Sequence, residues 1–180
     1  MGCDIHIFVE RKKNDKWVHY TGKHFSSVWG HAKEEKDNSP FDWRSYSMYG
    51  FLAGVRHSYI KPIKEPIYTI PDDTSEYVKK EFERWDGDGH SHSFLTAREL
   101  LEFDYNQDLR EPNDDFSTNS RKVLFEKKAH RKNTDFDEEE IDKTYYDFLG
   151  GPDSMFFTHV KELAELGEPD DVRIVFWFDN

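Results

Sequence analysis

The feature that most constrains this chain is its last apolar segment, residues 172–178, which reads VRIVFWF. It is the strongest strand signal in the sequence, because β-branched and aromatic residues dominate it. A strand that is apolar at successive positions is typical of a central strand covered on both faces. We therefore expect this segment to lie in mid-sheet, next to the first strand of the chain.

The first strand is predicted at residues 3–10, where apolar and polar residues alternate. Side chains on a strand have a period of two, so the alternation separates two faces. The residues of the more apolar face are Cys3, Ile5, Ile7 and Val9, and those of the other face are Asp4, His6, Phe8 and Glu10. A charged turn at residues 11–15 and a second strand at 16–20 then complete a hairpin.

Helical patterns predict about four helices between the terminal strands. They cover residues 43–57, 74–85, 96–104 and 155–166, with Asp42, Asp73 and Thr96 as the expected N-caps of the first three. The predicted fold class is therefore α+β, with a mostly antiparallel central sheet that contains both the N- and the C-terminal strand. We expect a single domain over residues 1–180, with a mobile polar insertion at 106–140 that carries blocks of opposite charge.

The charge of the chain limits its partners. Its formal net charge is −12 at neutral pH, whereas binding to duplex nucleic acid or to an acidic membrane surface needs a surplus of Lys and Arg. The single cysteine, Cys3, excludes an internal disulfide and fits a reducing compartment. Because the sequence has no apolar run of membrane-spanning length and no secretory signal, we expect a cytoplasmic protein.

Residues 89–93, GHSHS, are predicted to form a polar turn that leads into a helix. Thr96 is a suitable N-cap, and Glu99 three residues later completes the pattern of a capping box. A helix N-terminus has free backbone N–H groups and a partial positive charge, which favour an anion. Ser91, Ser93 and Thr96 are therefore candidate substrate-binding residues. A turn that only caps the helix and hydrogen-bonds locally would explain the same pattern.

Four side chains are candidates for a catalytic or metal site: Asp4, His6, His90 and His92. Carboxylate and imidazole groups bind zinc and manganese, and an Asp-x-His or His-x-His pair in an extended segment points both groups the same way. We expect at least three of the four to converge in one pocket, where they bind the metal or share acid–base work. The alternatives are a solvated polar strand face and a hydrogen-bonded network without chemistry.

Two arginines are candidates for holding an anion, because a guanidinium donates two parallel hydrogen bonds to a phosphate. Arg56 is expected at the rim of the histidine pocket. For Arg173 we expect a surface ion pair, and Asp179 is a further acid–base candidate. Cys3 is not favoured as a nucleophile, since its predicted strand face is the apolar one.

Four blocks stand out along the chain: residues 1–6, MGCDIH; 51–56, FLAGVR; 89–96, GHSHSFLT; and 171–180, DVRIVFWFDN. Together they resemble an uncharacterised family of phage and bacterial proteins. The resemblance implies a viral or prophage context and action in the host cytoplasm, and it supplies no activity. In that context a nucleotide signal of host immunity is an expected target.

Three functions fit these residues. The first is hydrolysis of a small phosphorylated or nucleotide-like substrate at the four candidate residues, with or without a divalent metal such as zinc or manganese. The second is the sequestering of a nucleotide without turnover, with Trp43 and Tyr46 stacking against the base. The third is inhibition of a partner protein through an exposed acidic surface. The first function requires titratable side chains that converge in a cleft, and the third requires no cleft.

Overall fold

The computed structural model contains a four-stranded antiparallel sheet with helices on both faces, which is the predicted α+β fold. It describes residues 2–22, 25–27, 39–56, 60–85, 87–107, 109 and 144–180. The mobile insertion predicted at 106–140 lies almost entirely outside the described residues.

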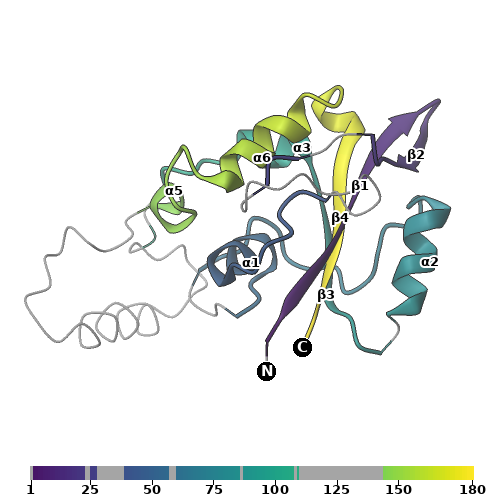
Figure 1. Cartoon of the computed structure of the whole chain (residues 1–180), viewed down its shortest axis with the longest axis horizontal. Helices are drawn as coiled ribbons and strands as arrows, with labels where there is room; N and C mark the ends of the chain where they lie inside the picture. Colours follow the sequence, from purple (N-terminus) through teal and green to yellow (C-terminus); the bar gives the residue numbers. More distant parts are fainter. Residues whose placement is uncertain are drawn as a thin grey trace, which may run out of the picture.

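The two terminal strands form the centre of the sheet (Figure 1). The strand order is β2-β1-β4-β3, and the strands span Lys16–His19, Asp4–Lys13, Val172–Asp179 and His90–Thr96 in that order. All three pairings are antiparallel. The arrangement confirms the expectation that the first and last strands are neighbours in mid-sheet.

Five α-helices occur in the described residues, against about four predicted. Their bounds are Tyr46–Ala53 for α1, Glu76–Arg84 for α2, Ala97–Glu102 for α3, Tyr145–Phe148 for α5 and Met155–Ala164 for α6. The additional helix is α5, a single turn closed by a capping box between Thr144 and Asp147. A short 3-10 helix, Pro169–Asp171, leads directly into β4.

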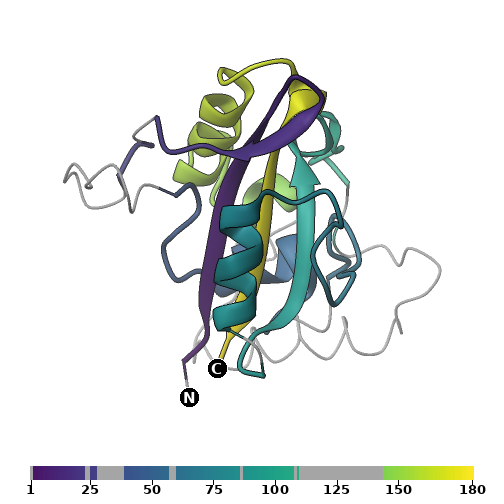
Figure 2. The same ribbon diagram turned by 90° about the vertical axis from the view of Figure 1, so that its right-hand side faces the viewer.

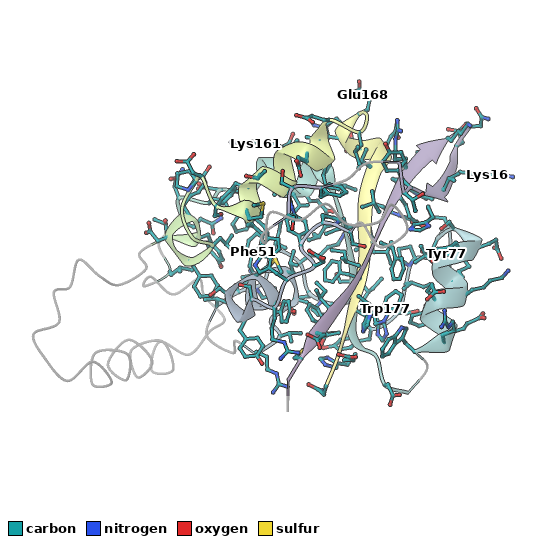
Figure 3. All side chains as sticks on the ribbon, viewed as in Figure 1. Lys16, Phe51, Tyr77, Lys161, Glu168 and Trp177 are labelled. Atoms are coloured by element: carbon teal, nitrogen blue, oxygen red, sulfur yellow. The ribbon has the colours of Figure 1, made fainter. Side chains whose placement is uncertain are left out.

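β4 is covered on both faces, as its apolar sequence predicts. From Val172 to Phe178 no residue is more than 3% exposed. Alternate residues of β4 pack in a large core with Phe51 and other residues of α1, α3, α5 and α6, whereas Val175 and Trp177 pack under α2 (Figure 3). Figures 1 and 2 show α2 on one side of the sheet and the other described α-helices on the opposite side.

Two of the three predicted helix caps are wrong. Ser45 caps α1 through its hydroxyl in place of Asp42, so the helix begins three residues later than predicted. Ser75 precedes α2 in place of Asp73, because the Asp73 carboxylate binds an arginine of β4 instead. Thr96 caps α3 with both hydrogen bonds of a capping box, which confirms the third prediction.

Residues 90–93 of the GHSHS segment belong to a strand, β3, so the predicted polar turn is wrong. β3 pairs along β4 with Phe94 opposite Val175, and a bulge falls between His90 and Ser93. Ser91 adopts a φ of 51°, in the left-handed region, and is the extra residue of the bulge. The segment is extended because this pairing satisfies the backbone groups along one edge of β4, a tertiary requirement that local polarity does not reveal.

Arg173 is buried, which corrects the expected surface ion pair. It is 3% exposed, and its Nε donates at 2.8 Å to Oε2 of Glu10, which is 0% exposed. Its Nη1 donates to Asp73 at 2.9 Å, and the guanidinium lies 4.0 Å from the ring centroid of Trp17. The second oxygen of Glu10 accepts the backbone N–H of Ser75 at 2.7 Å. This network therefore fixes the start of α2 to the two central strands.

Candidate functional site

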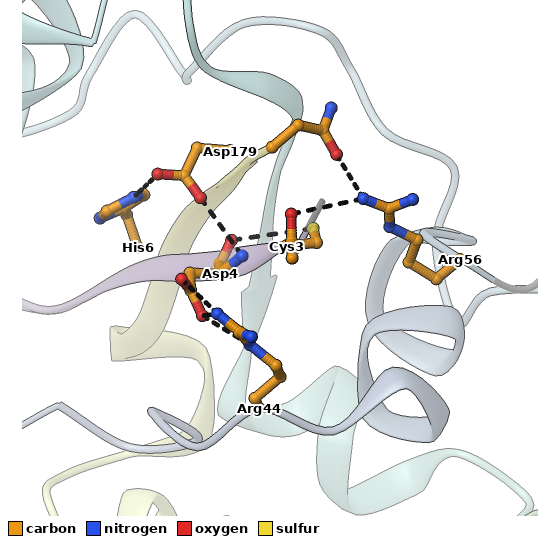
Figure 4. Close-up of polar contacts among 8 residues, drawn as sticks. Cys3, Asp4, His6, Arg44, Arg56 and Asp179 are labelled. Carbon is orange, nitrogen blue, oxygen red and sulfur yellow. Dashed lines mark hydrogen bonds and ion pairs between the residues drawn. The ribbon is translucent and has the colours of Figure 1, made fainter.

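The candidate site lies at the end of the sheet where β1 begins and β4 ends (Figure 4). Antiparallel pairing of Asp4 with Asp179 brings these two strand ends side by side. We call the polar side chains gathered there the terminal cluster. The terminal cluster consists of Asp4, His6, Arg44, Arg56, Asp179 and Asn180.

His6 and Asp179 form the centre of the terminal cluster. The Nε2 atom of His6 lies 3.3 Å from Oδ2 of Asp179, and the two side chains are 24% and 25% exposed. The other carboxylate oxygen accepts the backbone N–H of Asp4 at 3.2 Å, which fixes the orientation of the carboxylate. Because a carboxylate only accepts, this contact favours the tautomer of His6 in which Nε2 carries the hydrogen. Both residues are acid–base candidates in the sequence, but no sequence pattern indicates that they pair.

Aromatic packing also holds the ring of His6. The ring centroid of Trp85, the residue after α2, lies 3.9 Å from that of His6. Trp177, opposite His6 in the sheet, has its ring centroid at 6.2 Å. On the predicted polar face of β1, α2 and its following tryptophan therefore cover His6, whereas Asp4 is exposed.

Two arginines reach the terminal cluster from the segments around α1. Arg44 binds Asp4 through Nε at 3.0 Å and through Nη2 at 2.7 Å to each carboxylate oxygen. These hydrogen bonds raise the pKa of the exposed Arg44 guanidinium. Arg56 donates to Oδ1 of Asn180 at 2.8 Å and to the carbonyl of Gly2 at 3.4 Å. Sequence analysis named Arg56 and missed Arg44, since only the tertiary fold brings residue 44 to the start of β1.

Cys3 lies on the other face of β1, in the large core. Its side chain is fully buried, and burial raises the pKa of the thiol, an effect that the neighbouring Arg56 guanidinium opposes. A thiol in this state is a poor nucleophile. The structure thus confirms the predicted position of Cys3 on the apolar face of β1.

His92 shares the face of His6 but is separated from it by Trp177. The ring centroid of His92 lies 6.1 Å from that of Trp177, and β4 runs between the strands that carry the two histidines. Since neighbouring strands lie about 4.8 Å apart, the backbones at His6 and His92 are about 10 Å apart. Burial lowers the pKa of His92, and the adjacent His90 adds to the effect.

His90 points to the opposite face of the sheet. Its ring stacks on Phe178, with centroids 6.1 Å apart, and its Nδ1 lies 3.0 Å from the hydroxyl of Ser91. The bulge at Ser91 causes this difference, because one extra residue shifts the alternation that would place His90 and His92 on one face.

The four predicted catalytic or metal residues therefore do not come together as one group. Asp4 and His6 belong to the terminal cluster, whereas His92 lies beyond Trp177 and His90 on the other face. In the part of the chain that the structure describes, no three His, Cys, Asp or Glu side chains are placed to hold a metal ion. Binding of zinc or manganese stays a prediction that metal analysis of the purified protein can check.

The predicted anion site at the start of α3 is already closed by the chain itself. Thr96 accepts the N–H of Glu99 at 3.1 Å, and the Glu99 carboxylate accepts the N–H of Thr96 at 2.7 Å. Lys64 neutralises that carboxylate at 2.9 Å. Ser93 is 0% exposed within the sheet, and Ser91 contacts His90. These hydroxyls lie outside the terminal cluster.

The two predicted base-stacking residues lie on either side of the start of α1. Trp43 lines a cavity of about 240 Å³ between α1, α5 and α6. Tyr46 is 40% exposed, and its ring packs against Tyr49 with centroids 6.0 Å apart. A second cavity, of about 310 Å³, lies between the segment 69–72 and α2, and none of the predicted site residues lines it.

Comparisons with protein-family models, with curated proteins and with solved structures found no match to this chain. None of the described helices has the length and apolar character that crossing a bilayer requires.

Proposed function

We propose that this chain is a hydrolase of a small phosphorylated or nucleotide-like substrate, with His6 and Asp179 as its acid–base pair. The observation that carries the proposal is the contact of 3.3 Å between His6 Nε2 and Asp179 Oδ2 at a partly exposed position. A carboxylate that engages one ring nitrogen fixes the tautomer and leaves the other nitrogen as a base. We assign Asp4 and Arg56 to this site with Arg44, because Arg44 binds Asp4 and Arg56 binds Asn180, the residue after Asp179.

The chemistry proposed for His6 is general base and then general acid catalysis. Nδ1 of His6 takes a proton from water, the water oxygen bonds to phosphorus, and the bond from phosphorus to the leaving oxygen breaks. His6 then returns the proton to the leaving oxygen. Asp179 holds the ring and stabilises the imidazolium between the two steps.

Arg56 is the proposed binder of the substrate's anionic group. It is exposed, and among the described residues its guanidinium donates to neutral oxygens of Asn180 and Gly2. A guanidinium has five N–H donors, and those that do not contact these oxygens or the neighbouring Cys3 are the ones proposed to bind a phosphate. Arg44, by contrast, is held by the Asp4 carboxylate and positions that residue.

The context implied by the phage resemblance extends this proposal. A phage protein in the host cytoplasm that cleaves a nucleotide would remove a signal of host immunity. Sequestering such a nucleotide without turnover is the alternative function at the same arginine. An acidic interaction surface, consistent with the net charge of −12, is the further alternative.

Hydrolysis of small phosphomonoesters, phosphodiesters and cyclic nucleotides by the purified chain tests the proposal. We expect turnover by the wild type, a loss of about 10²-fold or more in His6→Asn, and little change in His19→Asn, which replaces a histidine outside the terminal cluster. Binding without turnover, unaffected by His6→Asn, would favour the sequestering alternative. Equal rates in wild type and His6→Asn would contradict the acid–base role.

A further inference from the structure

The outer side of β2 is an open edge of the sheet (Figure 1). β2 stands first in the order β2-β1-β4-β3, and among the described residues only β1 pairs with it. At the opposite edge, the carbonyl of His92 in β3 accepts the N–H groups of Ile67 and Tyr68, at 2.9 Å and 3.2 Å. A strand with one unpaired side is a template for another extended chain.

The register of β2 fixes which of its main-chain groups point outward. The N–H of Tyr20, the residue after β2, donates to the carbonyl of Val9 in β1 at 2.8 Å. In an antiparallel pair, successive residues direct their N–H and C=O groups alternately to the partner strand and away from it. Trp17 and His19 therefore direct their main-chain groups to the open side. The edge offers two N–H donors and two C=O acceptors to an added strand.

The hairpin that β1 and β2 form is cationic at its turn, although the chain has a net charge of −12. Residues 11–16, RKKNDK, contain four cations and one carboxylate. Lys13 and Lys16 are exposed and lie directly opposite each other, and Figure 3 shows Lys16 extending away from the rest of the molecule. Like charges in opposite positions destabilise a hairpin, and no described side chain forms an ion pair with either lysine. An anionic partner would offset this repulsion.

The two faces of the edge differ in chemistry. Lys13 and Lys16 share one face of the hairpin, so Trp17 and His19 lie on the other. His19 stacks on Tyr77 of α2, with ring centroids 4.2 Å apart. The Tyr77 side chain is 48% exposed. An added strand would therefore meet cations on one face and an exposed aromatic ring on the other.

These features select one kind of occupant. A second copy of this chain is a poor one, because its own β2 would bring further lysines to Lys13 and Lys16. A single-stranded nucleic acid matches the charge, but it has no peptide N–H and C=O groups to continue the sheet. An extended acidic peptide matches both the charge and the main-chain groups.

We propose that the β2 edge binds an extended acidic segment of a partner protein by strand addition. Acidic side chains of the segment lie on the face of Lys13 and Lys16, and apolar side chains lie on the face of Tyr77. The hairpin turn is at the end of β1 that is remote from the terminal cluster. The proposal therefore does not depend on the proposed hydrolysis.

Titration of the full chain with an eight-residue peptide of alternating Glu and Val, followed by NMR, tests this proposal. We expect saturable binding that slows hydrogen exchange of the Trp17 and His19 amides, which face the open side in the free chain. A peptide of alternating Lys and Val has the opposite charge and should bind at least about tenfold more weakly. A peptide of alternating Glu and Pro keeps the charge but lacks half of the N–H donors, so it should slow neither amide.

The double variant Lys13→Gln, Lys16→Gln tests the role of the cations. It removes two like charges that lie opposite each other, so its melting temperature should be no lower than that of the wild type. Its affinity for the peptide of Glu and Val should fall by about tenfold or more. The matched control, Lys61→Gln with Lys80→Gln, changes two exposed lysines outside the hairpin and should bind like the wild type.

Three results would overturn the proposal. They are the absence of saturable binding by the peptide of Glu and Val, unchanged affinity in the folded Lys13→Gln, Lys16→Gln variant, and binding that leaves the exchange of the Trp17 and His19 amides unchanged. Equally tight binding of an eight-nucleotide thymidine oligomer would show a general anion-binding surface and contradict strand addition.

Discussion

At the scale of single residues, His159 and His6 differ in what their ring nitrogens contact. His159 is 1% exposed, its Nδ1 accepts the N–H of Phe41 at 2.9 Å, and its Nε2 donates to the carbonyl of Ser26 at 2.6 Å. Both nitrogens are committed to backbone groups, so the ring has a structural role. His6 has Nε2 on the Asp179 carboxylate, and we propose its other ring nitrogen as the base.

Replacing His159 by Ala should therefore destabilise the fold strongly. The change leaves a buried backbone N–H and a buried carbonyl without their partner and opens a space beside Phe41. We expect a loss of about 2–4 kcal/mol in the free energy of unfolding, measured by urea denaturation. Thr21→Ala, at an exposed position, is the control and should change it by less than about 0.5 kcal/mol. A change in the free energy of unfolding as small as this in His159→Ala would contradict the structural role of His159.

Ser91 is the reason why His90 and His92 do not share one face of the strand. In a regular strand, His90 and His92 would share a face, as the sequence analysis assumed. The bulge at Ser91 adds a residue, and the two rings face opposite sides of the sheet. Nothing in the local sequence indicates this bulge, because a serine in the left-handed region reflects the pairing with β4.

At the scale of elements, the position of α2 depends on the buried ion pair between Glu10 and Arg173. The pair joins the two central strands, and its partners Asp73 and Ser75 lie just before the helix. α2 in turn leads to Trp85, which packs on His6. The ion pair thus positions one wall of the candidate site.

Glu10→Gln should destabilise the chain because it leaves the Arg173 charge buried with only Asp73 to balance it. We expect a loss of about 3–5 kcal/mol, measured by denaturation, and faster amide hydrogen exchange in α2. Replacing both residues by Met should restore much of the stability, because a buried ion pair contributes little against apolar residues of similar size. A double variant that is less stable than Glu10→Gln would contradict this account.

The elements themselves were largely predictable where a pattern is local. The apolar run of β4, the alternation of β1 and the Thr96 capping box all follow from residues close in sequence. The cap of α2 was not predictable, because Asp73 binds Arg173, which is distant in sequence, and therefore does not cap the helix. The cap of α1 was not predictable either. β3 was not predicted because it forms by pairing with β4, which is distant in sequence.

At the scale of the whole molecule, the sheet separates a large core from a smaller one under α2, and the buried histidines lie in or beside both. Burial is the main cause that lowers the pKa of His19 and His92 from 6.5. The unfolded chain therefore binds more protons than the folded one as the pH falls below about 6.5. The stability that neutral His19 and His92 contribute is complete above about pH 6.5. It is lost as the pH falls through the lowered pKa values of these two side chains in the folded chain.

The melting temperature should accordingly decrease between about pH 7 and about pH 5, above the range where most carboxylates titrate. The double variant His19→Gln, His92→Gln should show a shallower decrease over the same range. Differential scanning calorimetry at matched ionic strength measures both slopes. An equally steep decrease in the variant would show that other groups govern the acid range.

The terminal cluster was predictable in part. Adjacency of the first and last strands, once inferred, places Asp4 and His6 near Asp179, and all three were named from the sequence. The pairing of His6 with Asp179 depends on the register of β1 with β4. A register shift of one residue would destroy this pairing. The position of Arg44 beside Asp4 depends on the path of the chain before α1, and no sequence pattern indicates that path.

The most direct test of the account is a double-mutant cycle of His6→Asn and Asp179→Asn on the rate of substrate hydrolysis. If the two residues act as one acid–base unit, each single variant should lose about 10²–10⁴-fold in kcat, and the double variant should lose no more than the worse single variant. Melting temperatures close to that of the wild type would show that the fold is kept. Losses that multiply in the double variant, or a fully active Asp179→Asn, would contradict the pairing of His6 and Asp179 as the catalytic centre.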